Sequence, residues 1–415
     1  MYLTKYEQEM AQGKYGPGLQ KAINILIRYG KACGAERLVE ITSAHVMPKE
    51  PPELLSQFTE GIEELPVTTT THPLMSAFNP EKWEAMGIPA DFAAAELAEH
   101  EERQKIHGDL GFIKCYSCLP MHLGNLPQKG DYISWIGSCA QILGNSLIGA
   151  KTNKDGTIVN LCSALTGRAL YHGLLLDENR YAKVVIKLAE DIRLETDDDY
   201  GALGYYVGGH VIIGNVVFDG IPKSATFDQL KYLIAPVATS GSVHICHVTG
   251  ITPEAPTVEA ALGGKEPEDI VIVTRQDLEK TKNIFRYDPD QPVDLVIIGC
   301  PHVTVQEARR IAKILKDKKI AEGKRLWLGL SDATCTIVRA MGDAGIIEEA
   351  GGVFSNTCQA TIPDSPLPEN VQVVMTNSFK GAHYINSLQQ GKVRVMISSL
   401  EECLKALNLQ EAQVK

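Results

Sequence analysis

The feature that most constrains the fold is a regular alternation of strands and helices in the last third of the chain. Short apolar runs lie at 269–273, 293–298, 325–330, 371–375 and 393–397. Each is followed by a segment of helical pattern, at 276–285, 305–315, 333–344, around Lys380, and at 400–407. Strands that alternate with helices form βαβ units around a mostly parallel sheet. The sequence therefore predicts an α/β protein.

The first 265 residues show a less regular pattern. We predict helices at 1–30, 80–86 and 91–107, strands at 37–41 and 66–70, and a proline-rich loop at 47–57. The small residues of 134–148 favour a buried helix, and the β-branched residues of 205–218 favour a pair of strands. We divide the chain into an N-terminal α/β part, residues 1–265, expected to contain two subdomains, and a C-terminal βα-repeat domain, residues 266–415, which carries Cys300 and Cys358.

Charge and hydropathy exclude several classes of protein. The 415 residues carry a formal net charge of −11 without an extended patch of Lys and Arg, so we expect no nucleic-acid partner. The N-terminus has no signal-peptide pattern, and the apolar runs are too short to cross a bilayer. We therefore expect a cytoplasmic protein without a membrane partner. In that compartment the ten cysteines indicate metal binding, catalysis or plain packing rather than disulfides.

Cys300 is the cysteine whose surroundings most favour chemistry. It lies in the segment GCPH, directly after the apolar run 293–298, and the spacing of Thr304 and Glu307 predicts a helix start just beyond it. Ligands of an open parallel sheet bind beyond the carboxyl ends of its strands. The positive end of the helix dipole is expected to lower the pKa of the thiol, so that it can bind a metal or attack an electrophile. The alternative is a capped turn with an incidental cysteine.

Other predicted strand ends carry further candidates. Cys358 follows the run 352–357, and Cys118 forms a C-x-x-C pair with Cys115, a pattern that alone suggests zinc or redox chemistry. Polar groups at strand ends are Ser43, His45, Asn79, Ser331, Asp332, Asn377, Ser378 and Lys380. Beside thiolates they suit a ligand with a carboxylate or a phosphate, although each could instead be a helix cap. We expect the cysteines at 139, 162, 246, 335 and 403 to be packing residues.

These candidates fall together in one family. The chain resembles the large subunit of aconitase X, a group of iron-dependent hydro-lyases related to aconitase, over nearly its whole length. The segments that carry the resemblance are MYLTKYEQEM, ITSAHV, CLPMHLGN, NSLIGAKTNKDG, LTGRALYHGLLLDENR, HVTGITPEA, DLVIIGCPH and VMTNSFKGAHY. The resemblance implies an aconitase-like fold of three-layer αβα units with mostly parallel sheets.

The resemblance also implies an iron centre, either an iron–sulfur cluster ([4Fe-4S] or [2Fe-2S]) or a single iron. By their motifs its three ligands would be Cys118, Cys300 and Cys358. The family's substrate contacts correspond here to Ser43, Ala44, His45, Asn79 and Pro80. To these we add Ser138, Asn377 and Ser378 as candidate substrate-binding residues, and we name Ser43, His45 and Lys380 as candidate catalytic residues.

Known members of the family dehydrate a small hydroxyacid, either mevalonate 5-phosphate or cis-3-hydroxy-L-proline. The loss of hydroxide from an unactivated carbon needs a Lewis acid, which iron held by three thiolates can supply. In aconitase relatives the base is a serine on a mobile domain, and the split form of aconitase X carries that domain on a separate small subunit. The resemblance therefore implies a hydro-lyase with a small-subunit partner, and mevalonate 5-phosphate is the first candidate substrate.

Three segments depart from the family's pattern. The family's Trp-Ala-Glu-Ser-Ser is here WIGSC, so Gly137 replaces an acidic residue, while Lys154 and Asp332 each replace an arginine. An arginine that grips a carboxylate or phosphate is not matched by Lys or Asp. These changes leave the three cysteines in place and concern the substrate. One alternative follows, a divergent relative without turnover. A further alternative, a redox or zinc protein, rests on the pair Cys115 and Cys118 instead.

Overall fold

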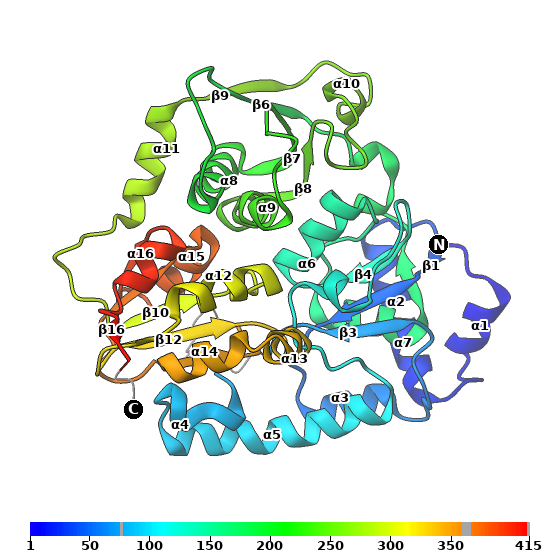
Figure 1. Cartoon of the computed structure of the whole chain (residues 1–415). Helices are drawn as coiled ribbons and strands as arrows, with labels where there is room; N and C mark the ends of the chain where they lie inside the picture. Colours follow the sequence, from blue (N-terminus) through cyan, green and yellow to red (C-terminus); the bar gives the residue numbers. More distant parts are fainter. Residues whose placement is uncertain (75–77, 359–366, 413–415) are drawn as a thin grey trace.

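The fold is built on three sheets of parallel strands (Figure 1). The computed structural model describes residues 1–74, 78–358 and 367–412. The first sheet has the order β3 (Thr68–Thr71), β2 (Ser43–Val46), β4 (Ile133–Trp135). The second has the order β8 (Ser242–Val248), β7 (Ile213–Asp219), β6 (Val184–Leu188), β9 (Asp269–Val273). The third has the order β13 (Gly352–Ser355), β12 (Arg325–Gly329), β10 (Leu295–Ile298), β14 (Val373–Thr376), β15 (Arg394–Ile397).

Helices cover these sheets, which confirms the α/β class with mostly parallel strands. They are α1 (Lys5–Ala11), α2 (Pro17–Ala32), α3 (Pro52–Thr59), α4 (Trp83–Met86), α5 (Ala90–Asp109), α6 (Ser138–Leu143), α7 (Thr157–Thr166), α8 (Asp197–Val211), α9 (Phe227–Ser240), α10 (Val258–Ala261), α11 (Arg275–Lys282), α12 (Val305–Leu315), α13 (Asp332–Ala340), α14 (Asp343–Ala350), α15 (Phe379–Leu388) and α16 (Leu400–Lys405). Two small antiparallel pairs complete the strands: β1 (Leu38–Glu40) with β5 (Arg168–Leu170), and β11 (Lys318–Lys319) with β16 (Gln410–Glu411).

The third sheet is buried on both faces, as its continuous apolar strands predict. Alternate residues of β10 enter two different hydrophobic clusters: Leu295 and Ile297 lie on one face, Val296 and Ile298 on the other. Helices α12, α14 and α16 pack on the second of these faces. Helix α15 packs on the first and contacts α8 and α9, which belong to the second sheet. This packing joins the second and third sheets into one body.

Three of the predicted elements are wrong. The helix predicted at 1–30 is two helices, because Gly13 and Gly16 take positive φ values of 85° and 100° between α1 and α2. The loop predicted at 47–57 contains the start of α3. There Pro52 occupies the first helical turn, where its missing N–H costs no hydrogen bond, and Leu55 and Phe58 join the core of the first sheet.

The third error is the strand pair predicted at 205–218. Residues 205–211 belong to α8, and only β7 is a strand. The reason is close helix packing: a Cβ at Gly204 would lie 1.9 Å from the carbonyl oxygen of Leu233, and one at Gly208 would lie 2.5 Å from that of Val237. The glycines recur at helical spacing and let α8 touch the backbone of α9.

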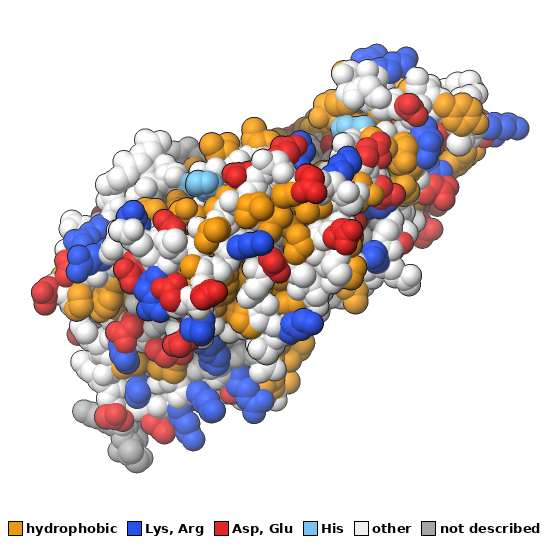
Figure 2. Space-filling view, turned by 90° about the horizontal axis from the view of Figure 1, so that it is seen from above, with side chains coloured by type: hydrophobic (Ala, Val, Ile, Leu, Met, Phe, Trp, Pro, Cys, Tyr) orange, Lys and Arg blue, Asp and Glu red, His pale blue; other side chains and the backbone are white. Residues whose placement is uncertain are grey.

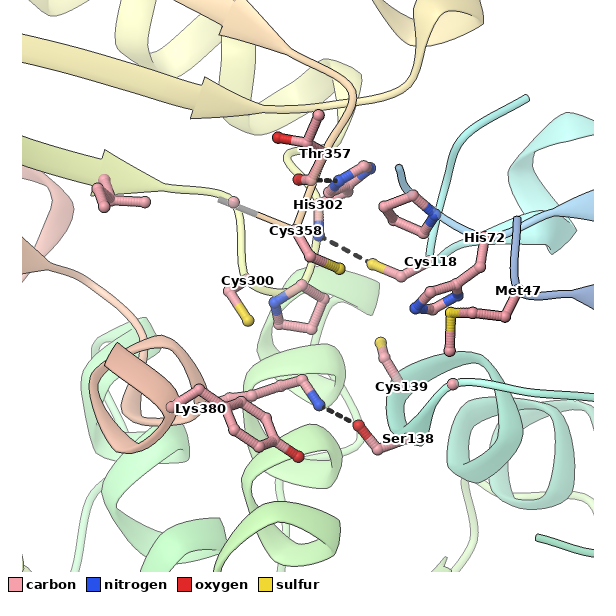
Figure 3. A pocket seen from close by; sticks show the side chains of 16 residues that line it. Met47, His72, Cys118, Ser138, Cys139, Cys300, His302, Thr357, Cys358 and Lys380 are labelled. Carbon is pink, nitrogen blue, oxygen red and sulfur yellow. Dashed lines mark hydrogen bonds between the residues drawn. The ribbon is translucent and has the colours of Figure 1, made fainter. Parts of the chain in front are cut away.

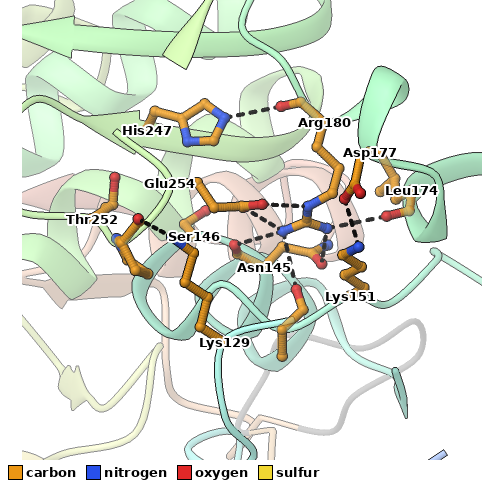
Figure 4. A network of polar contacts seen from close by, with 12 residues as sticks. Lys129, Asn145, Ser146, Lys151, Leu174, Asp177, Arg180, His247, Thr252 and Glu254 are labelled. Atoms are coloured by element: carbon orange, nitrogen blue, oxygen red, sulfur yellow. Dashed lines mark hydrogen bonds and ion pairs between the residues drawn. The ribbon is translucent and has the colours of Figure 1, made fainter. Parts of the chain in front are cut away.

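The buried helix predicted at 134–148 begins later than expected. Residues 133–135 form β4, α6 follows, and a π-helical turn, η3 (Gly144–Ile148), ends the segment. A polar network holds this turn in place (Figure 4). The buried guanidinium of Arg180 donates to the Glu254 carboxylate at 2.5 and 2.8 Å, to Asn145 Oδ1 at 3.2 Å, and to the carbonyls of Asn145 and Ala150. The network fixes the C-terminal end of α6 against the second sheet.

The predicted division near residue 265 stays a prediction; that position lies between α10 and β9. Over the described residues, every helix is too short or too polar to traverse a bilayer.

Candidate active site

A cavity of about 160 Å³ lies where the first and third sheets meet (Figure 3). Its walls are the loops that follow β2, β3, β4, β10 and β13 and the loop before η2, together with the first turns of α6 and α15. Parallel sheets place ligands beyond the carboxyl ends of their strands, and five such ends open here. The described lining residues include four cysteines, two histidines and one lysine, and they include no Asp, Glu or Arg.

Three of the thiols are the predicted iron ligands. Cys118 lies in the loop before η2 (Pro120–Leu123), Cys300 in the loop after β10, and Cys358 in the loop after β13. In Figure 3 their sulfur atoms point into the same space. The Cys300 loop depends on Gly299, whose φ is +122° and whose Cβ would lie 2.4 Å from the carbonyl oxygen of Gly329. Only glycine lets the chain leave β10 this close to β12.

The charge states of the thiols differ from the expectation. Burial raises the pKa of Cys300 to about 11, although Lys380 acts in the opposite direction, so the prediction that the helix start lowers this pKa is wrong. Burial also opposes ionisation of Cys118. There, however, a hydrogen bond from Cys139, the neighbouring His302 and Lys380 prevail and lower the pKa to about 5. The backbone N–H of His302 donates to Cys118 Sγ at 3.2 Å. The stabilised thiolate is thus Cys118.

Cys139 is the fourth thiol of the cavity, and its placement there was not predicted. It lies in the first turn of α6, directly after β4, is 2 % exposed and hydrogen-bonds the Cys118 thiolate. Burial and this contact raise its pKa well above the usual value, so it stays a protonated donor. The sequence predicted a packing role for Cys139, because residues 134–148 were assigned to a buried helix and the strand end of β4 before it was not recognised.

The donor set of the cavity is one that iron takes, since cysteine thiolates hold iron–sulfur clusters. The imidazole of His302 adds a buried Nδ1 that has no hydrogen-bond partner among the residues that the structure describes. Over the described ranges, no group of three or more His, Cys, Asp or Glu side chains meets closely enough to enclose a metal ion. The thiols therefore line a common space and do not meet at one point.

The ammonium of Lys380 is the positive charge of the cavity. It is 6 % exposed, donates to Ser138 Oγ at 2.6 Å and lies 5.1 Å from the ring centre of Tyr384. Burial works against the charge, but Tyr384 and the thiols raise the pKa of Lys380 on balance. No salt bridge to a carboxylate is present for it within the described part of the chain. An ammonium in this setting attracts an anionic ligand.

The remaining predicted residues are not among the described residues that line the cavity. Ser43, Ala44 and His45 belong to β2, and Ser43 Oγ accepts from Trp135 Nε1 at 2.9 Å. Asn79 caps η1 (Pro80–Lys82), which begins at Pro80, by accepting from the N–H of Glu81. Asn377 donates to the hydroxyl of Tyr232 at 2.8 Å. Ser378 caps α15 and hydrogen-bonds the carbonyl of Cys300, so it holds the Cys300 loop.

Several lining residues escaped the sequence analysis, His72 and Pro73 above all. Both follow β3 directly. The strand-end rule that singled out Cys300 applies equally to the run 66–70, and it would have found them. Two of the departures from the family's pattern differ in their position. Gly137 lines the cavity, whereas Asp332 lies outside it and accepts hydrogen bonds from Asn356 Nδ2 at 2.9 and 3.1 Å.

Comparisons with known proteins agree on one family. The models of the aconitase X first, second and third domains match residues 1–178, 182–283 and 293–408. The phosphomevalonate dehydratase large subunit of Methanocaldococcus jannaschii is 34% identical over 98% of this chain and 100% of its own length. The cis-3-hydroxy-L-proline dehydratase of Hypocrea jecorina is 32% identical over 97% of this chain and 68% of its own length.

The crystal structure of Thermococcus kodakaraensis aconitase X in its holo-form has the same fold. It superposes with a TM-score of 0.82 at 29% sequence identity, over 98% of this chain and 99% of that one.

Proposed function

The chain belongs to the aconitase X family, and on that premise we propose that it is the large subunit of a two-subunit, iron-dependent hydro-lyase that removes water from a small hydroxyacid. Its relatives are dehydratases, so the chemistry is that of a lyase. The observation that supports the proposal most is the cavity itself, which combines ligand thiols with one buried ammonium.

We propose that Cys118, Cys300 and Cys358 hold the iron that the family implies. When bound there, iron would supply the Lewis acid that stabilises the departing hydroxyl group. The N–H of His302 and the thiol of Cys139 keep Cys118 ionised, and so ready for a metal. We propose an iron–sulfur cluster ahead of a single ion, because cysteine thiolates are the ligands that hold such clusters.

We propose that Lys380 binds the substrate's carboxylate or phosphate, with Ser138 directing the ammonium. A cavity with this one cation and without a described Asp or Glu on its walls suits an anion. The secondary ammonium of cis-3-hydroxy-L-proline would have no carboxylate partner here. Mevalonate 5-phosphate is therefore the first candidate substrate and cis-3-hydroxy-L-proline the second.

The other candidate residues from the sequence support the cavity without lining it. We propose that Ser43, Ala44, His45, Asn79, Pro80, Asn377 and Ser378 shape the loops that carry the lining groups. The proton-abstracting serine would come from a small subunit, as the name "large subunit" of the relatives suggests. We further propose a cytoplasmic location, because thiols that hold iron must stay reduced, as thiols are in that compartment.

The test is dehydration by the iron-loaded complex of both subunits, followed as loss of water from mevalonate 5-phosphate and from cis-3-hydroxy-L-proline. We expect turnover of mevalonate 5-phosphate, a loss of about 100-fold in kcat/KM for Lys380→Met, and no change for Lys392→Met, which alters an exposed lysine. Turnover of cis-3-hydroxy-L-proline alone would overturn the substrate assignment. Inactivity on both would favour a relative without turnover.

A further inference from the structure

A chain of four hydrogen-bonding side chains leads from the core of the first sheet to the wall of the cavity. Asn125 Nδ2 lies 2.9 Å from Thr70 Oγ1, Thr70 Oγ1 lies 2.8 Å from His45 Nδ1, and His45 Nε2 lies 3.0 Å from His72 Nδ1. Of the four residues only His72 lines the cavity. All four are buried, and His45 and Thr70 are 0% exposed.

The direction of this chain is fixed at its far end. Asn125 Nδ2 also lies 2.9 Å from the carbonyl oxygen of Ala44, which can only accept, so the amide nitrogen donates both of its hydrogens. Thr70 Oγ1 is then an acceptor toward Asn125. Its own hydrogen has a near acceptor in His45 Nδ1 at 2.8 Å and a distant one in the carbonyl of Ala44 at 3.5 Å. The hydroxyl therefore donates to His45.

The hydrogen position on each histidine ring follows from the hydrogen bond that the ring accepts. Because His45 Nδ1 accepts, the hydrogen of its neutral ring lies on Nε2 and is donated to His72 Nδ1. His72 in turn carries its hydrogen on Nε2. Burial lowers the pKa of His45 to about 3 and that of His72 well below its usual range, so both rings are neutral and hold one hydrogen each.

His72 Nε2 is the end of the chain, and within the described residues it has no hydrogen-bond partner. Its ring occupies the space beside Gly137. A Cβ at Gly137 would lie 2.2 Å from His72 Cε1 and 2.8 Å from Nε2. The imidazole thus takes the room that a side chain at position 137 would need. Figure 3 shows it on the cavity wall between Met47 and Cys118.

We propose that His72 is a specificity-determining residue whose Nε2–H donates a hydrogen bond to an oxygen of the substrate, with the direction of that bond set by Asn125, Thr70 and His45. The proposal deepens the proposed function. A donor at this point binds a carboxylate, phosphate, carbonyl or hydroxyl oxygen and excludes a group that can only donate, such as an ammonium. The substrate class is therefore a hydroxyacid without an amino group.

The first test needs no substrate. In the full chain labelled with ¹⁵N-histidine, long-range ¹H–¹⁵N spectra assign the protonated nitrogen of each ring. We expect hydrogen on Nε2 of both His45 and His72. His247 is the internal reference, because its Nε2 lies 2.9 Å from the carbonyl of Arg180 and must donate. Thr70→Ser keeps the hydroxyl and should keep both states, whereas Thr70→Val removes it and should lose the preference.

A hydrogen on Nδ1 of His72 in the unmodified chain would overturn the proposal, whatever the substrate is. The second test uses the two-subunit complex and mevalonate 5-phosphate. Thr70→Val should raise KM about 3- to 10-fold with little change in kcat, and Thr70→Ser should leave both unchanged. Equal KM values for the two variants would also contradict it. If the unmodified complex does not turn over mevalonate 5-phosphate, the proposed function fails and the spectra alone decide the role of His72.

Discussion

At the scale of single residues, the cavity wall depends on Gly137, because the ring of His72 fills the volume that a side chain at position 137 would occupy. Gly137 takes a φ of +88° before α6, and the ring of His72 fills the volume beside it. Two restrictions therefore act on position 137: a left-handed backbone that favours glycine, and a contact closer than any Cβ tolerates. The histidine at position 72 therefore requires a glycine at position 137.

Gly137→Ala should lower the free energy of unfolding by about 2 to 4 kcal/mol, from backbone strain and overpacking combined. Chemical denaturation measures it. In a His72→Ala background the same change should cost about 1 to 2 kcal/mol less, since the clash is gone and only the strain remains. The control is Gly156→Ala at the start of α7, where φ is −72° and a Cβ has open space. Equal costs in both backgrounds would contradict the steric explanation.

The thiols show how far single residues could be predicted. Position at a strand end identified Cys300 and Cys358, because parallel strands bring such ends together, whereas Cys118 was identified by its spacing from Cys115 and by the family's motif. The prediction of which thiol is ionised was wrong. The helix dipole was expected to ionise Cys300, but burial outweighs it, and Cys118 is ionised by contacts from Cys139 and His302 that lie far from it in sequence. Such contacts depend on how the sheets pack, which sequence spacing does not record.

At the scale of elements, the strands and helices of the third sheet were predictable and those around α8 were not. In β10 and α12 local preference and packing agree: the strand is apolar throughout, and Thr304 and Glu307 form the capping box that starts the helix. In α8 they conflict. Its valine and tyrosine residues favour a strand locally, and the helix exists because its glycines fit against α9.

Gly204→Ala tests that explanation. A Cβ at 1.9 Å from the carbonyl oxygen of Leu233 forces α8 and α9 apart, so we expect a loss of about 2 to 4 kcal/mol in the free energy of unfolding. Gly209→Ala lies on the same helix with open space around it and should be neutral or stabilising by up to about 1 kcal/mol. Thermal or chemical unfolding of the two variants compares them directly. A Gly204→Ala chain as stable as Gly209→Ala would mean that the helices do not need this glycine.

At the scale of the whole molecule, the site depends on how the first and third sheets face each other. The first supplies His72, Cys118, Ser138 and Cys139, and the third supplies Cys300, Cys358 and Lys380. The second sheet contributes no lining residue among those described, but the Arg180 network ties it to the turn that ends α6. Neither sheet holds all three ligand thiols. An iron centre therefore requires the two sheets to keep their position relative to each other.

The iron and sulfide content of the anaerobically purified complex tests this arrangement most directly. We predict that Cys300→Ser lowers iron affinity by more than about 100-fold, because it removes a ligand outright. Cys118→Ser and Cys358→Ser should do the same, although the three lie on separate loops. Cys33→Ser changes an exposed cysteine and should retain the iron of the unmodified chain. Unchanged iron content in Cys300→Ser would contradict the proposed centre.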